Sequence, residues 1–399
     1  MHPMIEEIET DIIIIGGGIS GLWTLNRLRA EGYQAILLEA NALGAGQTLK
    51  SQGIIHGGLK YALTGILSSS SSALENMPNR WKACLNGKGE IDLSKVKILS
   101  PDQLLWSTGS LSSDMVSFLA SQTLKSHIQK LKKSEYPTVL QHPQFKGQVY
   151  RLEELVLDTV SLIQALSQVP QDCIFQANPE LVFSNDTSRV SHVLIKKEKQ
   201  TIKLSAKRFL LTAGEGNEDL VKKTNHLSIA MQRRPLHMVI VKWPENHPFF
   251  GHCMDKSINP RITITSHKTS GGHCIWYLGG ELAEQGIHRT ASEQIDTTKR
   301  EINDLFPWLN LSKTQWASFL VNRAEAKQPG QKRPDSIFVQ SLENLIIAWP
   351  TKLALAPLLS DSVLKMLEEQ GITSKSEFVN LPVFLEKAPI AIPIWDQLF

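Results

Sequence analysis

Three glycines near the N-terminus constrain the fold of this chain more than any other feature. Gly16, Gly18 and Gly21 form a Gly-x-Gly-x-x-Gly pattern. The pattern follows residues 11–15, a β-branched apolar run that predicts a buried strand, and precedes residues 22–31, which have the apolar spacing of a helix. In such a turn the first glycine permits the tight bend out of the strand, the second lets the backbone approach a pyrophosphate, and the third lets helix and strand pack closely.

An acidic residue completes this arrangement. Residues 35–38 form a second apolar run that ends at Glu39, which stands 18 residues after Gly21. A carboxylate at the end of this second strand binds both hydroxyls of an adenosine ribose, and it repels a 2′-phosphate. The N-terminus of the intervening helix offers N–H groups to the phosphates. We therefore predict a βαβ dinucleotide site that disfavours NADP, while the fingerprint alone leaves FAD and NAD open.

A second glycine-rich segment favours the longer FAD molecule. Residues 44–48 read Gly-Ala-Gly-Gln-Thr and extend the predicted ligand contacts beyond the first turn. Residues 44–61 resemble the second motif of the D-amino acid oxidase superfamily. Within them, Ile-His-Gly-Gly-Leu-Lys-Tyr at 55–61 is most similar to glycerol-3-phosphate dehydrogenases and L-2-hydroxyglutarate oxidases. Weaker matches follow in the expected chain order at residues 157–159, 211–214, 323 and 349–353.

The resemblance implies FAD as the cofactor, held covalently or non-covalently, and a hydride taken from a C–H bond beside a hydroxyl or amine. It implies reoxidation by oxygen, a quinone or another acceptor. Lys352 would place positive charge near the flavin N1 and C2 carbonyl, where it stabilises the reduced ring. The residues implied for the cofactor site are Gly16, Gly18, Ile19, Ser20, Gly21, Glu39, Ala40, Gly46, Gln47, Thr48, Ser51, Gln52, Gly53, Ile55, His56, Gly57, Ala213, Gly214, Thr351, Lys352 and Leu353.

Three residues are the leading candidates for catalysis. His56 is a candidate base because imidazole titrates near neutral pH, and the alternative is a structural histidine whose backbone faces the flavin. Arg323 is a candidate for holding a carboxylate or phosphate, since a guanidinium binds both in a bidentate way. Arg261 and Arg289 are weaker candidates, for which a surface salt bridge is the alternative. Tyr277 is a candidate pocket-lining residue.

Two departures from the family pattern bear on function. Residues 349–350 are Trp-Pro where the family has paired glycines, and proline lacks an N–H, so the backbone contact to the flavin is open to change. Residues 321–324 lack the common Gly-x-Arg-Pro, and an Arg-Pro pair stands instead at 333–334. Two function classes therefore stay open. One is an FAD-dependent oxidoreductase for a small, anionic 2-hydroxy acid, amino acid or polyol phosphate, and the other is a flavin-binding protein or subunit without independent turnover.

Strand patterns typical of nucleotide-binding folds lie at the start, in the middle and at the end of the chain, with antiparallel-looking material between them. We predict an α/β fold in which a Rossmann-type FAD-binding domain is interleaved with an α+β substrate domain containing an antiparallel sheet. The length of 399 residues agrees with two domains. The expected FAD-binding domain comprises residues 1–85, 150–220 and 330–399, and the substrate domain comprises residues 86–149 and 221–329.

Several local patterns give further predictions. Residues 68–72 are five consecutive serines, which predict a surface loop or helix end. Residues 113–131 have the apolar spacing of a helix with a basic C-terminal end. Residues 190–202 alternate in part between apolar and polar and predict a β-hairpin, and residues 209–212 predict a separate short strand.

Composition narrows the partners and the location. The formal net charge of +3 is too small to argue for nucleic acid, so we expect a small-molecule substrate. The acidic start predicts no signal peptide, and no apolar run approaches the roughly 18 residues of a membrane span. We therefore expect a cytoplasmic protein without a transmembrane segment, with peripheral membrane contact left open.

The four cysteines are scattered, which predicts reduced thiols rather than a disulfide framework. The tripeptide Gly-His-Cys occurs twice, at residues 251–253 and 272–274. A metal site built from both tripeptides is the alternative to chance occurrence. We interpret them as chance and expect no metal.

Overall fold

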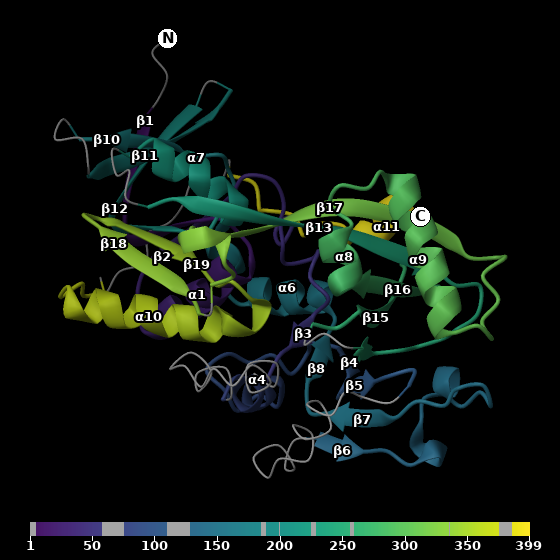
Figure 1. Cartoon of the computed structure of the whole chain (residues 1–399). Coiled ribbons are helices and arrows are strands. Elements are labelled where there is room, and N and C mark those ends of the chain that lie inside the picture. The colour runs from purple at the N-terminus through teal and green to yellow at the C-terminus, as the bar shows by residue number, and fades with distance from the viewer. Residues whose placement is uncertain are drawn as a thin grey trace.

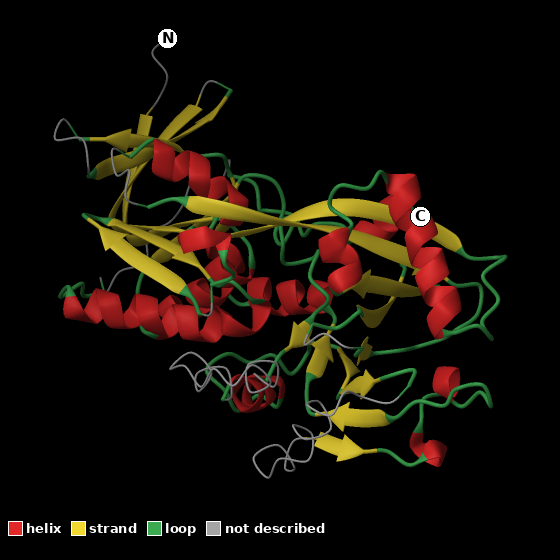
Figure 2. Ribbon diagram, viewed as in Figure 1, coloured by secondary structure: helices red, strands yellow, loops and turns green. Residues whose placement is uncertain are grey.

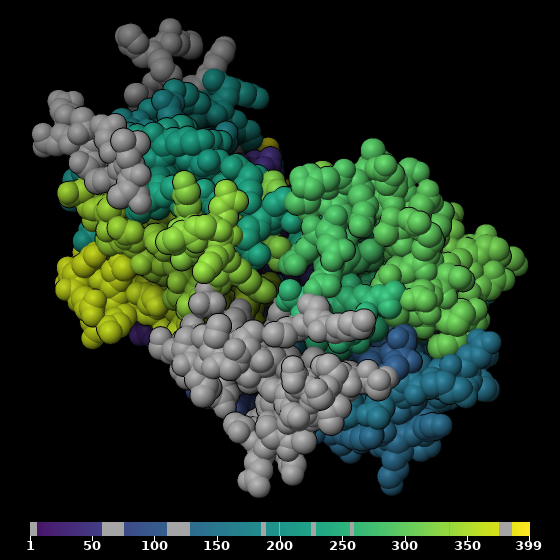
Figure 3. Space-filling view, viewed as in Figure 1, coloured from purple at the N-terminus to yellow at the C-terminus, as the bar shows by residue number. Residues whose placement is uncertain are grey.

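The computed structural model shows two packed bodies that lie side by side (Figure 1). Each body has a sheet at its centre with helices against it, as Figure 2 shows. In the space-filling view the green surface of the second body lies beside the teal and yellow-green surface of the first (Figure 3). The structure describes residues 5–57, 76–109, 128–184, 189–198, 200–224, 229–255, 259–334, 336–374 and 385–399.

Parallel strands form the centre of the first body. Ile12 and Ile14 of its first strand are buried in one core cluster, and Ile13 and Ile15 are buried in another. A strand covered on both faces must be apolar at successive positions, which explains the four isoleucines in a row. The parallel strands follow the order β9 (Ile174–Gln176), β2 (Ala35–Glu39), β1 (Ile5–Ile15), β12 (Gln200–Leu211) and β19 (Leu345–Trp349).

Three helices pack together on one face of this sheet. They are α1 (Ile19–Ala30), α6 (Thr159–Gln168) and α10 (Ala356–Glu369), and all contribute buried side chains to the same core cluster. Asp158 caps the N-terminus of α6, because its side chain accepts a hydrogen bond of 3.0 Å from the Ser161 N–H. Antiparallel strands are added to the sheet, namely β10 (Glu180–Phe183), β11 (Val190–Lys197) and β18 (Phe338–Leu342).

A largely antiparallel sheet forms the second body, as predicted. α9 (Ala291–Leu305) supplies Ile302 and Leu305 to the core on one face of it, where Trp106, Trp276 and Phe306 are also buried. Only the pairing of β14 with β5 is parallel among the described strands of this sheet. The strand order is β17 (Gln315–Ala326), β13 (Met231–Lys242), β16 (Cys274–Gly279), β15 (Ile262–Lys268), β14 (Gly251–Cys253), β5 (Gln103–Trp106), β7 (Val149–Leu152) and β6 (Ile128–Lys130).

A third sheet carries the segment that follows the glycine-rich loop. Its strands are β3 (Ile54–Ile55), β8 (Leu155–Leu157) and β4 (Ile98–Ser100), in that order. β3 pairs antiparallel with β8, and this pairing sets Ile54 opposite Val156 and Ile55 opposite Leu155. The other described α-helices are α4 (Met77–Leu85), α7 (Asn217–Lys222), α8 (Glu281–Gln285) and α11 (Ile394–Leu398).

The final segment of the chain contacts both bodies. Residues 385–391 run along the first body, where Ile390 forms a β-bridge with Leu43. α11 then packs on the second body, and its Trp395 is buried in one cluster with Tyr277. The last residues therefore lie against the sheet of the second body.

The predicted domain bounds differ from the observed packing at three places. The segment around Leu93 packs in the core of the first body, although we expected it in the second. Residues 150–152 belong to β7 of the second body, although we expected them in the first. Trp395 also packs on the second body instead of the first. The amino-acid composition does not show where the chain passes from one body to the other, because both bodies bury similar apolar residues.

Of the predictions for single segments, one is confirmed and others differ from the structure. The hairpin is confirmed by the antiparallel pairing of β11 with β12. β12 continues to Leu211, so the separate strand expected at 209–212 is the end of this longer one. The helix expected over 113–131 is wrong at its C-terminal end, because residues 128–130 form β6 and pair with β7. Residues 113–127 and the serines at 68–72 lie outside the described residues.

The four cysteines are free thiols, as expected. Cys253 is buried, and burial raises the pKa of its thiol to about 12. In the described part of the chain, no helix is both long and apolar enough to cross a membrane.

Asn217 provides a test of how the first body is held together. Its side-chain amide donates to the Leu211 and Ala348 carbonyls at 3.1 and 3.2 Å and accepts from the Ala213 N–H at 2.8 Å. Replacing Asn217 with alanine leaves these buried groups unsatisfied, so we expect the free energy of unfolding to fall by about 3 kcal/mol. Urea titration followed by circular dichroism measures this loss.

The matched control is Asn303→Ala, because Asn303 is an exposed residue of α9. We expect this control to change the free energy of unfolding by less than about 0.5 kcal/mol. Equal urea midpoints for the Asn217 variant and the unaltered protein would contradict the prediction.

Candidate active site

The glycine turn between β1 and α1 is packed against the protein on one side and open on the other. A Cβ on Gly16 would lie 2.5 Å from the Ala213 Cα, and one on Gly21 would lie 2.0 Å from the Gly16 carbonyl oxygen. Internal packing therefore requires glycine at both positions. Among the described residues, a Cβ on Gly18 would meet only the Thr48 hydroxyl within 4 Å, at 3.3 Å. The open space beside Gly18 lies where α1 begins, which is where the sequence predicts the pyrophosphate.

The loop after β2 closes over this turn. Glu39 accepts the Gly17 N–H at 2.6 Å with one carboxylate oxygen and the Asn41 N–H at 2.9 Å with the other. The Thr48 hydroxyl accepts the N–H of Ile19, the first residue of α1, at 3.0 Å. The structure thus brings the predicted adenosine-site and phosphate-site residues to one place. Ala40, beside Glu39, is exposed, and in the described part of the chain no atom lies within 4 Å of where a Gly46 Cβ would be.

Two glutamines of the glycine-rich segment reach the second body instead of open space. The side-chain oxygen of Gln47 accepts the Ala324 N–H at 3.0 Å. The Gln52 amide donates to the Thr263 and Tyr277 carbonyls at 3.2 and 2.9 Å. These side chains were implied for cofactor contact, and in this structure they fasten the cofactor loop to the second body.

His56 is the first residue after β3 of the third sheet. Ser51 donates its hydroxyl proton to the Thr48 carbonyl at 2.8 Å, and Gly53 has a φ of +71° with the Leu157 carbonyl 2.2 Å from where a Cβ would be. The chain then enters β3, whose Ile55 is fully buried, while 40% of the His56 side chain stays exposed. Gly58, Leu59, Lys60 and Tyr61 of the motif lie outside the described residues.

Glu154 and His252 lie beside His56, and the sequence did not reveal either. The His56 Nδ1 lies 3.2 Å from Glu154 Oε2, and Glu154 Oε1 accepts the Gly57 N–H at 3.0 Å. The His252 Nε2 lies 3.9 Å from Glu154 Oε2, and its Nδ1 lies 2.9 Å from the Thr263 hydroxyl oxygen. We name these three residues the His56–Glu154–His252 cluster.

Two sequence signals could have pointed to this cluster. Glu154 directly precedes the apolar run of residues 155–157, which marks a buried strand, and a buried acid needs partners. His252 belongs to the first Gly-His-Cys tripeptide, which we had interpreted as chance. The ligand atoms of the cluster lie within 4.8 Å of one another, close enough for a divalent ion, although we had expected no metal.

The charges of the cluster follow from burial and proximity. Desolvation lowers the pKa of His56 from 6.5, and positive charge on His252 and Lys352 acts in the same direction, while Glu154 opposes this lowering. Burial alone would raise the pKa of the Glu154 carboxyl, but the two histidines hold it well below its usual range. A neutral imidazole therefore stands beside an ionised carboxylate. In this state Nδ1–H donates to Glu154, and Nε2 carries the lone pair.

The turn at Trp349 keeps its bulk out of the site. The indole is buried in the core of the first body, and its N–H donates to the Gly214 carbonyl at 2.9 Å. This bond holds the turn at Gly214, which has a φ of +59°. The replacement of the family glycine by tryptophan therefore adds a core contact behind the cofactor site.

Thr351 points to a ligand at this turn. It has a φ of +61°, which is strained for a β-branched residue. Among the residues that the structure describes, its buried hydroxyl has no hydrogen-bond partner. The next residue is Lys352, which lies near enough to His56 to lower the pKa of this imidazole. Leu353 follows it in the chain. The orphaned hydroxyl at Thr351 fits the flavin end of the predicted FAD, and the open space beside Gly18 fits its pyrophosphate.

The other candidate residues occupy different surroundings. Arg323 precedes the residue that bonds Gln47 and lies 3.3 Å from the Glu284 carboxylate, and desolvation lowers the pKa of this guanidinium to about 10. Tyr277 is fully buried, and its hydroxyl donates to the Lys50 carbonyl at 2.6 Å. Tyr277 thus has no exposed surface for a substrate in this structure.

The two alternative arginines are engaged elsewhere. Arg261 pairs with Glu301 and Asp304, and Arg289 donates to the Gln294 side chain at 2.9 Å. Arg323 also pairs with Glu284, but of the three arginines it is the one that neighbours Ala324, the residue that bonds the cofactor loop, and we keep it as the candidate for substrate binding.

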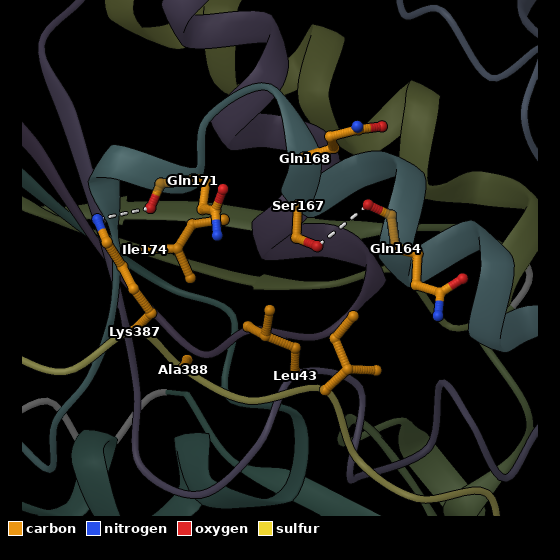
Figure 4. Close-up of a pocket in the computed structure, with 9 residues that line it drawn as sticks. Leu43, Gln164, Ser167, Gln168, Gln171, Ile174, Lys387 and Ala388 are labelled. Atoms are coloured by element: carbon orange, nitrogen blue, oxygen red, sulfur yellow. Dashed lines mark hydrogen bonds between the residues drawn. The ribbon is translucent and has the colours of Figure 1, made fainter.

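A separate hollow of about 360 Å³ lies on the first body (Figure 4). Glutamines of α6 and Lys387 of the final segment line it, together with aliphatic side chains. Lys387 donates to the Gln171 carbonyl at 3.0 Å, and Ser167 donates to the Gln164 carbonyl at 3.2 Å. None of the predicted site residues lines this hollow, and we assign it no ligand.

The different surroundings of the glycines predict different consequences of substitution. We expect Gly18→Val to fold but to weaken FAD binding by about 10- to 100-fold, because its side chain fills the open space. We expect Gly21→Val to fail to fold, because its Cβ meets a backbone oxygen. Flavin absorbance per protein and thermal melting measure these two effects. Gly109→Val is the control, since a Cβ at Gly109 has no atom of the described residues within 4 Å. FAD retention by Gly18→Val would refute the assignment.

Comparison with known proteins agrees with this geometry. Residues 11–341 match the family model described as FAD dependent oxidoreductase. A relative named "Probable FAD-dependent oxidoreductase" from Pseudomonas aeruginosa is 43% identical over 397 residues, which cover 99% of this chain and 100% of that protein. One component of the anaerobic glycerol-3-phosphate dehydrogenase of Escherichia coli is 34% identical over 67 residues, which cover 17% of this chain and 12% of that protein.

Solved structures give the same result. The crystal structure of the Pseudomonas aeruginosa FAD dependent oxidoreductase matches with a TM-score of 0.85 and 39% identity over 99% of both chains. Glycine oxidase from Geobacillus kaustophilus shares the fold, with a TM-score of 0.62, 16% identity and coverage of 94% of this chain and 98% of that one. The family match spans most of the chain and the full-length relative is well above 30% identical. This chain belongs to the family of FAD-dependent oxidoreductases.

Proposed function

We propose that this protein oxidises a C–H bond beside a hydroxyl or amine of a small anionic substrate, namely a 2-hydroxy acid, an amino acid or a polyol phosphate. When bound, FAD supplies the hydride acceptor. The observation that carries the proposal is the arrangement of His56, whose imidazole is half exposed and neutral, with Nδ1 held by Glu154 and Lys352 close by. Its Nε2 is suited to take the hydroxyl or amine proton.

Two cations, Lys352 and Arg323, support an anionic substrate. Lys352 is close to His56 in space, and Arg323 lies beside the residue that bonds the cofactor loop. We assign Arg323 the role of holding the carboxylate or phosphate, because a guanidinium matches both groups. Oxygen or a quinone is the proposed acceptor that completes the reaction.

The relatives do not separate the substrate classes. The glycerol-3-phosphate dehydrogenase component matches over 17% of the chain, and glycine oxidase shares the fold at 16% identity. The full-length relative has a name that states no substrate. Both a polyol phosphate and an amino acid therefore belong in a first test.

Anaerobic mixing of the yellow protein with candidate substrates tests the function. We expect one of L-2-hydroxyglutarate, glycerol 3-phosphate and a set of amino acids to bleach the flavin. His56→Asn should slow bleaching by about 10²- to 10⁴-fold, because the proton acceptor is lost. His273→Asn is the control, since His273 is an exposed histidine. If no compound bleaches the flavin, the substrate class is wrong, and a flavin-binding subunit without turnover becomes the better interpretation.

The charge state of His56 predicts how the rate depends on pH. The base works as the neutral imidazole, and its pKa is lowered from 6.5. The rate of flavin reduction at low substrate concentration should therefore be full at neutral pH and be lost as the pH falls through a value below 6.5. Stopped-flow absorbance across acidic and neutral pH measures this limb. A midpoint above neutral pH, or a limb that persists in His56→Asn, would speak against His56 as the base.

A further inference from the structure

We propose that Glu154 is the positioning residue of the His56 base. We propose further that His252 counteracts Glu154, because a positive charge on His252 disfavours a second positive charge on His56. The inference deepens the proposed function and rests on it for the role of His56 as base. It assigns Glu154 and His252 no direct contact with the substrate.

The main chain places Glu154 opposite His56. β3 and β8 pair antiparallel with Ile55 opposite Leu155. One step further along this register lies the pair of His56 and Glu154. The carboxylate is then held by the Gly57 N–H at 3.0 Å, so a main-chain bond fixes it independently of the imidazole. Glu154 is therefore an anchor for the histidine, because its own position is set by the strand pair and by this bond.

The carboxylate fixes which ring nitrogen of His56 carries the proton. Glu154 is 6% exposed and ionised, so its Oε2 accepts a hydrogen bond from Nδ1–H. The lone pair is then on Nε2. When the substrate O–H or N–H bond breaks, its proton forms an N–H bond at Nε2, and bound FAD would accept the hydride from the adjacent C–H bond. The imidazolium formed stands beside the Glu154 carboxylate, which stabilises it without taking the proton.

His252 acts on the same carboxylate from β14. Its Nδ1 lies 2.9 Å from the Thr263 hydroxyl oxygen, and its Nε2 lies 3.9 Å from Glu154 Oε2, beyond hydrogen-bond distance. The ring centroids of His56 and His252 are 6.2 Å apart. Positive charge on His252 or Lys352 therefore opposes protonation of His56, whereas Glu154 favours it. Glu154 and His252 therefore act in opposite directions on the protonation of the His56 imidazole.

NMR of the FAD-loaded protein with isotopically labelled histidine tests this arrangement without a substrate. His56→Asn identifies the His56 signals. We expect neutral His56 to carry its proton on Nδ1. Glu154→Gln should lower the pKa of His56 further and weaken the Nδ1–H preference, while His252→Asn should raise this pKa. Glu153→Gln is the matched control, because Glu153 is the neighbouring, exposed acid with 53% of its side chain uncovered.

The outcomes separate this inference from the proposed function. An unchanged pKa and tautomer of His56 in Glu154→Gln would overturn the inference, even if a substrate bleaches the flavin. One tightly bound divalent ion per purified protein would also overturn it, because the ion would take the place of the Nδ1 proton. If the variants show the expected pKa changes but no substrate bleaches the flavin, the positioning role is supported and the proposed function is wrong. Should Glu154→Gln fail to fold, Glu154→Asp keeps the charge but shortens its reach, and a loss of the Nδ1–H preference in it supports the inference.

Discussion

The contact between Gly21 and the Gly16 carbonyl is the constraint on which the rest of the cofactor site depends. A single methyl group at Gly21 would lie 2.0 Å from that oxygen, and one at Gly16 would lie 2.5 Å from the Ala213 backbone. The end of β1, the start of α1 and the turn after β12 can therefore meet only at glycine. Since these elements meet there, the loop carrying Glu39 and Thr48 closes over the start of α1, and open space is left beside Gly18.

Local sequence patterns predicted this part of the fold, because its geometry is set by near neighbours in the chain. The strand, the glycine turn, the helix and Glu39 all lie within residues 11–39. Glu154 and His252 were missed because they reach His56 through strand pairings between distant segments. The same limit explains β6, where pairing with β7 outweighs a helical spacing.

Residues matched to the family by position can still differ in what their side chains contact. The resemblance implied cofactor contacts for Gln47 and Gln52, yet both amides bond main-chain groups of the second body. The Trp-Pro pair at 349–350 departs from the paired glycines of the family, yet the Trp349 indole points into the core and holds Gly214. Backbone position was thus predictable from the pattern, whereas side-chain direction depended on packing that only the folded structure defines.

The route of the final segment has a mechanical consequence. It is fastened to the first body through the bridge between Leu43 and Ile390, and α11 is buried against the sheet of the second body. Few residues separate these two attachments, so the segment is a short tether across the joint between the bodies. The length of this segment limits how far the two bodies can separate, unless Trp395 leaves its buried position. The cofactor loop and this segment connect the two bodies at two separate places, so a change in the relative position of the bodies has to break contacts at both.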